Sequence, residues 1–122
     1  PRFPDMSEPY NKSLIDEVKT IARNNGIRYH TGTYAGISGP TFETPAEYKY
    51  IRTLGADAVG MSTVPENIAA RHTGIKVFAI SVITDLGIDG RIIEISHEDV
   101  IAAAKQSEPK LTLIFSELVG SL

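Results

Sequence analysis

The chain has 122 residues, of which 42% are hydrophobic and 22% are charged, enough for a single domain with its own core. Its formal net charge is −3, so the chain lacks the excess of positive charge that binding to nucleic acid or to an anionic membrane surface would need. Neither is expected as a partner. Without cysteine the chain can form no disulfide or thiolate metal site, which suits a reducing compartment. No apolar run reaches the roughly 20 residues that span a bilayer. We therefore expect a cytoplasmic protein.

Two elements are predicted at the start of the chain. Apolar residues recur at three-to-four spacing between residues 11 and 25, which predicts a helix that packs on one face. Gly26 stands where such a helix ends in a left-handed residue. Residues 28–38 are rich in tyrosine, threonine and isoleucine with interspersed glycine, which predicts a strand that lets a ligand or another backbone approach closely.

The next helix carries its start signal in the sequence. Thr44 offers an N-cap, Pro45 occupies the first helical position, and Glu47 completes a capping box. We expect this helix to run to about Leu54 and to stop at Gly55.

A strand, a helix and a second strand are predicted between residues 58 and 84. The short apolar run 58–62 suits a buried parallel strand, residues 63–66 start a helix that ends near His72, and residues 76–84 form the next strand. Such a crossover unit implies a parallel sheet with helices on its faces, so we predict an α/β fold.

The last part of the chain is predicted as a loop followed by a helix. Residues 85–95 include two glycines and form the loop, Ser96 caps the final helix, and Asp99 stands at its third position. Pro109 removes an amide donor from that helix, so we expect a kink or a break there.

Two blocks distinguish this chain from a generic α/β domain. Residues 39–47 read GPTFETPAE and place an aromatic and a carboxylate on a turn before a helix. Residues 55–66 read GADAVGMSTVPE, an apolar strand that ends in small polar residues. Together with Thr84 and His97 downstream, these blocks closely resemble the C-terminal part of the trimeric purine nucleoside phosphorylases, and the resemblance covers residues 2–118.

The resemblance implies a three-layer α/β/α fold with a mixed, largely parallel sheet, in which residues 1–122 form the C-terminal portion of a phosphorylase domain. In the family, the main phosphate-gripping elements lie upstream of position 1. The implied reaction is phosphorolysis of purine (deoxy)ribonucleosides to free base and (deoxy)ribose 1-phosphate by a homotrimer, with inorganic phosphate as co-substrate and no other cofactor. We expect the 122-residue segment to supply base and ribose recognition and to be inactive by itself.

The same resemblance assigns roles around the base and the phosphate. It implies that Glu43 accepts hydrogen bonds from the purine N1 and exocyclic region while Phe42 stacks against the base. It further implies that Val59 lines the base pocket, that Met61 packs against the ribose, and that Ser62 hydrogen-bonds phosphate. Ordinary core packing is the alternative for Val59 and Met61.

Further residues are assigned to the base and the sugar. Thr84 and Asp85 end a predicted strand at its carboxyl edge, where ligands bind in open α/β sheets. By resemblance, Tyr34 lies beside the sugar pocket, His97 hydrogen-bonds the ribose 5′-hydroxyl, and Phe3 covers the ribose of a neighbouring subunit. No second ligand stands at helical spacing from a histidine, so no metal site is predicted.

Asp85 departs from the family pattern, because the 6-oxopurine enzymes commonly carry asparagine there. An asparagine amide can donate to N7 and O6, whereas an ionised aspartate only accepts. Asp85 must therefore be protonated, bind through water, or prefer a 6-amino group. Methylthioadenosine phosphorylases carry aspartate at this point but lack a glutamate matching Glu43, and they are the enzymatic alternative. A non-catalytic purine-binding module is the other alternative.

Overall fold

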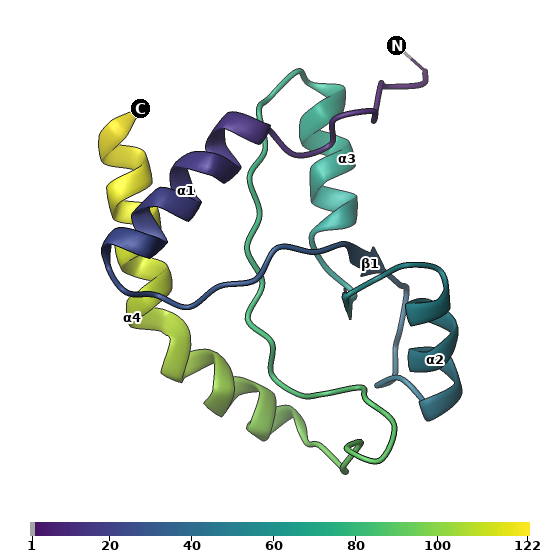
Figure 1. The fold of residues 1–122 in the computed structure, drawn as a ribbon. Helices are drawn as coiled ribbons and strands as arrows, with labels where there is room; N and C mark the ends of the chain where they lie inside the picture. The colour runs from purple at the N-terminus through teal and green to yellow at the C-terminus, as the bar shows by residue number, and fades with distance from the viewer. Residues whose placement is uncertain (1) are drawn as a thin grey trace.

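The computed structural model describes residues 2–122, and within them the chain forms four helices and two short strands. In chain order these are α1 (Lys12–Asn24), β1 (Tyr34–Gly36), α2 (Pro45–Thr53), β2 (Ala58–Gly60), α3 (Val64–His72) and α4 (His97–Ser121). Figure 1 shows α1 and α4 side by side at one end of the molecule and α2 at the other, with long extended segments between them. None of the helices in this part of the chain combines the length and the apolar character needed to cross a membrane.

The two strands form a parallel sheet in which Tyr34 pairs with Ala58 and Gly36 pairs with Gly60. Because α2 connects them, β1, α2 and β2 form a parallel crossover, and the α/β class is confirmed; the crossover predicted over residues 58–84 is wrong, because its second strand does not form. Both strands are shorter than predicted. Just before β1 the Thr33 amide donates to Oδ2 of Asp57 at 2.8 Å, so a side chain, and not strand backbone, satisfies this amide.

The strand predicted over residues 76–84 is wrong. The segment is extended, and side chains from Ala79 to Thr84 alternate between exposed and half-buried, but the sheet of the described residues contains β1 and β2 only. A backbone hydrogen bond from the Asn11 amide to the Val77 carbonyl, at 2.7 Å, ties the segment to the start of α1. Side-chain alternation predicts extended backbone, whereas a strand also requires a hydrogen-bonded neighbour.

The helices begin where the sequence signals predicted. In α2 the Thr44 hydroxyl accepts from the Glu47 amide at 3.2 Å, and the Glu47 carboxylate accepts from the Thr44 amide at 2.7 Å, which confirms the capping box. Ser96 and Asp99 form the same pair of bonds at the start of α4. After α1, Gly26 adopts a φ of +63°, as expected for a left-handed helix end.

Pro109 does not break α4. The helix runs continuously through it for 25 residues, so the expected break is wrong. Figure 1 shows the helix axis changing direction along its length, which agrees with the alternative expectation that an internal proline bends a helix.

The core lies between α1, α4 and the extended segment 76–84. Its buried members come from one face of each helix and are Val18, Ile21, Ala22, Ile114 and Leu118. Phe78 and Ile80 of the extended segment pack against them, and the Phe78 ring meets the Phe115 ring edge-on at 6.1 Å between centroids. The one-sided packing predicted for the first helix is therefore confirmed, and the extended segment is held by its side chains.

Candidate functional site

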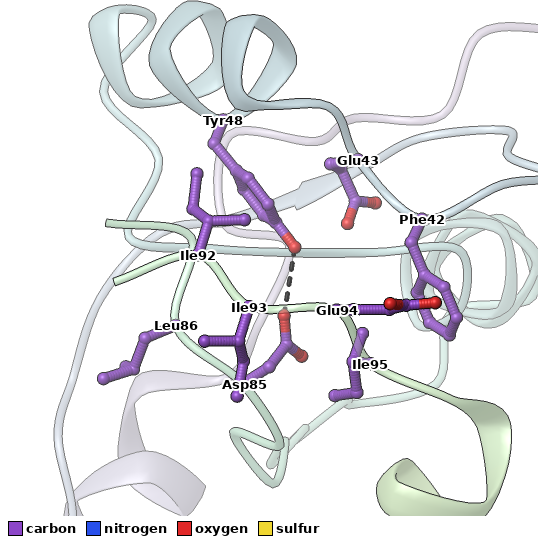
Figure 2. Close-up of a pocket in the computed structure, with 9 residues that line it drawn as sticks. All are labelled: Phe42, Glu43, Tyr48, Asp85, Leu86, Ile92, Ile93, Glu94 and Ile95. Atoms are coloured by element: carbon purple, nitrogen blue, oxygen red, sulfur yellow. Dashed lines mark hydrogen bonds between the residues drawn. The ribbon is translucent and has the colours of Figure 1, made fainter. Parts of the chain in front are cut away.

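A cavity of about 260 Å³ lies between the beginning of α2 and the loop that follows the extended segment. Its walls come from the turn before α2, from α2 itself and from residues 85–95. The lining residues are Phe42, Glu43, Tyr48, Asp85, Leu86, Ile92, Ile93, Glu94 and Ile95. Figure 2 shows Tyr48 reaching from α2 toward Asp85 on the opposite wall, with Glu43 and Phe42 beside it.

The Asp85 carboxylate is held on both of its oxygens. The Tyr48 hydroxyl donates to Oδ2 at 3.0 Å, and the Thr84 hydroxyl donates to Oδ1 at 2.9 Å. Burial and the bond to Asp85 raise the pKa of Tyr48 well above its ordinary value of 10, and the Glu43 carboxylate adds to the effect. The phenol therefore keeps its proton at neutral pH and serves as a donor to Asp85.

The cavity combines carboxylates with an apolar surface. Glu43, Asp85 and Glu94 contribute carboxylates, and none of the nine described residues that line the cavity is a lysine or an arginine. The Phe42 ring is 50% exposed, so one part of it is free to cover a ligand. Such a site can accept hydrogen bonds from the N–H groups of a flat, largely apolar molecule.

A second group of side chains lies at the ends of the two strands. The Tyr34 hydroxyl is 3.5 Å from the Ser62 hydroxyl oxygen. A Cβ at Gly60 would overlap the Tyr34 hydroxyl, and a Cβ at Gly39 would overlap the Met61 sulfur. These glycines therefore let Tyr34 and Met61 lie directly against the backbone.

Thr63 follows this second group and starts α3. Its φ of +74° is rare for a residue with a side chain, and its hydroxyl oxygen lies 3.3 Å from that of Ser62. It makes no side-chain cap, so α3 begins by a different geometry from α2 and α4.

The structure brings together some of the residues predicted to contact the base. Phe42, Glu43 and Asp85 line one cavity, and Thr84 is bonded to Asp85 behind it. Val59 is the central residue of β2 and is half-buried, outside the lining of that cavity. The roles assigned to these residues stay predictions.

The residues predicted to contact sugar and phosphate are more dispersed. Tyr34, Met61 and Ser62 form the second group and do not line the cavity. His97 is the exposed first residue of α4. Phe3 is 82% exposed, and the Arg2 guanidinium carbon lies 5.5 Å from the centre of its ring.

The sequence-based prediction omitted Tyr48, although a signal for it existed. Helical side chains lean toward the helix N-terminus, so a residue one turn into α2 can reach the turn that carries Glu43. Its partner Asp85 lies 37 residues further along the chain, which no local pattern reveals. Within residues 2–122, no cluster of three or more histidine, aspartate or glutamate side chains is arranged to hold a metal ion.

The chain is similar in sequence to a known protein family and to individual proteins. The family model described as the phosphorylase superfamily matches residues 1–120. Purine nucleoside phosphorylase 1 of Geobacillus stearothermophilus is 46% identical over 105 residues, which cover 86% of this chain and 38% of the relative. Purine nucleoside phosphorylase of Bos taurus is 42% identical over 128 residues, which cover 99% and 43%.

Solved structures agree with these relatives. Isoform 2 of purine nucleoside phosphorylase from Schistosoma mansoni, in complex with cytosine and ribose-1-phosphate, superposes with a TM-score of 0.92 at 42% identity and covers 98% of this chain. The Schistosoma mansoni enzyme in complex with inosine gives 0.93 at 36% identity and covers all of it. The matches span 43% and 44% of those structures, and the chain spans about two fifths of the length of the curated relatives it matches.

Proposed function

This chain belongs to the phosphorylase superfamily, and on that basis we propose that the protein carrying it is a purine nucleoside phosphorylase. The reaction cleaves the N-glycosidic bond of a purine (deoxy)ribonucleoside with inorganic phosphate and yields the base and (deoxy)ribose 1-phosphate. The observation that carries the proposal is the cavity in which Phe42, Glu43 and Asp85 meet. The relatives named purine nucleoside phosphorylase support it.

The proposed role of this segment is to recognise the base. During phosphorolysis negative charge builds on the departing purine, so hydrogen bonds to the base that strengthen as the bond breaks lower the barrier. Glu43 accepts from the N–H groups of the base, and Phe42 covers a face of the ring. Asp85 accepts hydrogen bonds from the Tyr48 and Thr84 hydroxyls and places a second carboxylate in the cavity, across from Glu43. Val59 of β2 lies outside the lining of this cavity, so no contact with the base is assigned to it here.

The second group of side chains is proposed to hold the sugar and the phosphate. Ser62 contacts phosphate through its hydroxyl just before α3, at the helix end whose dipole favours an anion. Tyr34 and Met61 lie beside Ser62 and contact the ribose. Isoform 2 of the Schistosoma mansoni enzyme was solved in complex with ribose-1-phosphate, which supports this assignment.

The remaining proposals concern the assembled protein. His97 hydrogen-bonds the ribose 5′-hydroxyl, and Phe3 covers the ribose of a neighbouring subunit in a cytoplasmic homotrimer. The whole domain is a three-layer α/β/α structure with a mixed, largely parallel sheet. Residues 1–122 form its C-terminal portion, and the reaction uses phosphate as co-substrate without metal or organic cofactor.

An assay of the protein as its gene encodes it tests the proposal. We expect release of base from a purine nucleoside to require phosphate and to produce equal amounts of base and pentose 1-phosphate. The isolated 122-residue segment is expected to release none. Base release that proceeds equally fast without phosphate, or no cleavage of any purine nucleoside, would contradict the proposal. Faster turnover of S-methyl-5′-thioadenosine than of inosine or adenosine would favour the alternative enzyme.

A further inference from the structure

Tyr48 occupies a singular position in the cavity. Among the nine described residues that line it, Tyr48 is the one whose side chain can donate a hydrogen bond while all the carboxyl groups are ionised. Its hydroxyl lies close enough to both Glu43 and Asp85 for the two carboxylates to raise its pKa. The Tyr48 hydroxyl donates its hydrogen to Oδ2 of Asp85, at 3.0 Å.

The Tyr48 ring is fixed by the loop that follows Asp85. A Cβ built on Gly87 would lie within 2.5 Å of Cε1 and Cγ of Tyr48, closer than real atoms approach, so the ring lies directly on the Gly87 backbone. Only glycine leaves room for the ring at this position. This contact fixes the ring in the position from which its hydroxyl reaches Asp85, and Figure 2 shows the resulting hydrogen bond.

This arrangement restricts what Asp85 can do. With Tyr48 donating to one oxygen and Thr84 to the other, the carboxylate is oriented as an acceptor. Glu43 offers a second acceptor from the opposite wall. An amino group at C6 of a purine carries two hydrogens, one toward N1 and one toward N7, so it can donate to both carboxylates. A carbonyl at C6 has no hydrogen to donate to Asp85, although the N1–H of such a base can still donate to Glu43. Asp85 is therefore the carboxylate that distinguishes the two kinds of base.

We propose that Tyr48 is a positioning residue for Asp85 and thereby determines base specificity, selecting purines with an amino group at C6 over purines with a carbonyl there. The inference rests on the proposed function and deepens it. Tyr48 acts through Asp85, so removal of its hydroxyl alters the choice between bases rather than the binding of all bases alike.

The test compares adenine and hypoxanthine by titration calorimetry with the protein as its gene encodes it. The unaltered protein is expected to bind adenine roughly tenfold more tightly than hypoxanthine, the discrimination that one hydrogen bond to a charged group supplies. Tyr48→Phe frees the Asp85 carboxylate to turn away from the base, so that it no longer selects against the carbonyl. The ratio of the two dissociation constants should then fall to within about twofold of unity. Tyr50→Phe, on the same helix and 64% exposed, should leave the ratio unchanged.

Two further variants separate this role from a general structural one. Gly87→Ala displaces the Tyr48 ring without removing its hydroxyl and should reduce the same ratio. In an Asp85→Asn background, which should itself favour hypoxanthine, Tyr48→Phe should change the ratio less than twofold, because its target carboxylate is gone. Circular dichroism of each variant identifies any that has not folded, and the remaining variants then decide.

The outcomes distinguish this inference from the proposed function. Equal weakening of both bases by Tyr48→Phe would overturn the inference and leave the phosphorylase assignment standing. The inference would also be overturned if the unaltered protein preferred hypoxanthine and Tyr48→Phe abolished that preference. In that case the Tyr48 hydroxyl would donate to the C6 carbonyl instead of positioning Asp85. A protein that binds neither base, and cleaves no purine nucleoside, would overturn the proposed function and this inference with it.

Discussion

Glu43 and Asp85 reach one cavity from distant parts of the chain, and each is held there by its immediate surroundings. Glu43 stands in the turn before α2, whose start is fixed by the capping box of Thr44 and Glu47. Asp85 directly follows the extended segment 76–84 and receives two hydroxyl hydrogen bonds. Two carboxylates in one cavity repel each other, and the Tyr48 phenol near both of them offsets part of that repulsion.

The first prediction concerns Glu43. Glu43→Gln keeps the shape of the side chain but removes its charge and replaces one acceptor oxygen with a donor. Base binding should weaken about 10- to 100-fold, because a hydrogen bond to a charged group contributes about 1.5–3 kcal/mol. Calorimetric titration with a purine base measures the effect. Glu66→Gln on α3, away from the cavity, is the matched control, and equal affinities in the two variants would refute the role of Glu43.

For individual residues of the site, the sequence predicted those that are neighbours along the chain and missed a contact between residues far apart in the chain. Phe42 and Glu43 stand in one short block, so their resemblance to a known motif was enough to select them and their shared cavity followed. Asp85 was selected by its place at the end of an extended run. The bond between Tyr48 and Asp85 was beyond prediction, because spacing along the chain does not reveal which loop folds over which helix. The need for glycine at position 87 appears only once the Tyr48 ring is placed.

Among the elements, α2 matters most for the site because its capping box fixes the turn that carries Glu43. The pKa of Glu47 is lowered from its ordinary value of 4.5 by the hydrogen bond from the Thr44 amide and then by the one from the Thr44 hydroxyl. A pKa lowered on folding stabilises the folded state above the ordinary value, and this contribution is lost as the pH falls through the lowered pKa. The cap should therefore weaken in acid.

The second prediction follows from this linkage. Thr44→Ala should lower the free energy of unfolding by about 1 kcal/mol at pH 7, the usual effect of a lost N-cap. The difference from the unaltered protein should shrink as the pH falls below 4.5, where Glu47 takes up its proton. Urea unfolding at neutral and acidic pH measures both values. Thr53→Ala, at the other end of α2, should show an effect independent of pH; a constant difference for Thr44→Ala as well would argue against the linkage.

The third prediction concerns the packing of α4 on α1. Ile114 is 1% exposed in the centre of the core, so Ile114→Ala should lower the free energy of unfolding by about 2–5 kcal/mol through lost burial and the cavity left behind. Val119→Ala, on the same helix but 68% exposed, should change it by less than about 0.5 kcal/mol. Thermal and chemical denaturation compare the two variants. Similar losses would show that the core is not where the structure places it.

The sequence predicted the helices better than the strands, for a physical reason. Capping residues and apolar spacing act within a few residues, so the starts of α2 and α4 could be predicted without knowledge of the fold. A strand depends on a neighbour far along the chain, and the segment 76–84 has the alternation of a strand without a paired backbone. The proline at 109 was read correctly as a source of bending, but the 25-residue helix around it tolerates the missing amide donor.

The molecule as a whole exposes more surface than its mass requires. Its accessible surface is 8996 Å², whereas a compact protein of 13.2 kDa exposes about 6,400 Å². Large apolar side chains contribute to the excess, among them Leu54, Ile75 and Ile83, each more than half exposed. A two-stranded sheet is also marginal as a scaffold. The described residues therefore present apolar surface that favours contact with further polypeptide.

The fourth prediction addresses this exposed surface. The purified 122-residue chain should bind the dye ANS with a strong increase in fluorescence, and it should self-associate at micromolar concentration because burial of apolar surface drives association. Fluorescence titration and sedimentation velocity detect the two effects, with a compact monomer of similar mass as the control. If the chain sedimented as a monomer and did not increase the fluorescence of ANS, its apolar side chains would not be exposed in solution, which would contradict this prediction.

The most direct test of this account is a crystal structure of the protein with a purine base bound. We predict that the base lies in the cavity of Figure 2, with hydrogen-bonding atoms about 2.7–3.2 Å from the carboxylates of Glu43 and Asp85 and with the Phe42 ring against its face. A base bound elsewhere, with the Glu43 carboxylate turned away from it, would contradict the account.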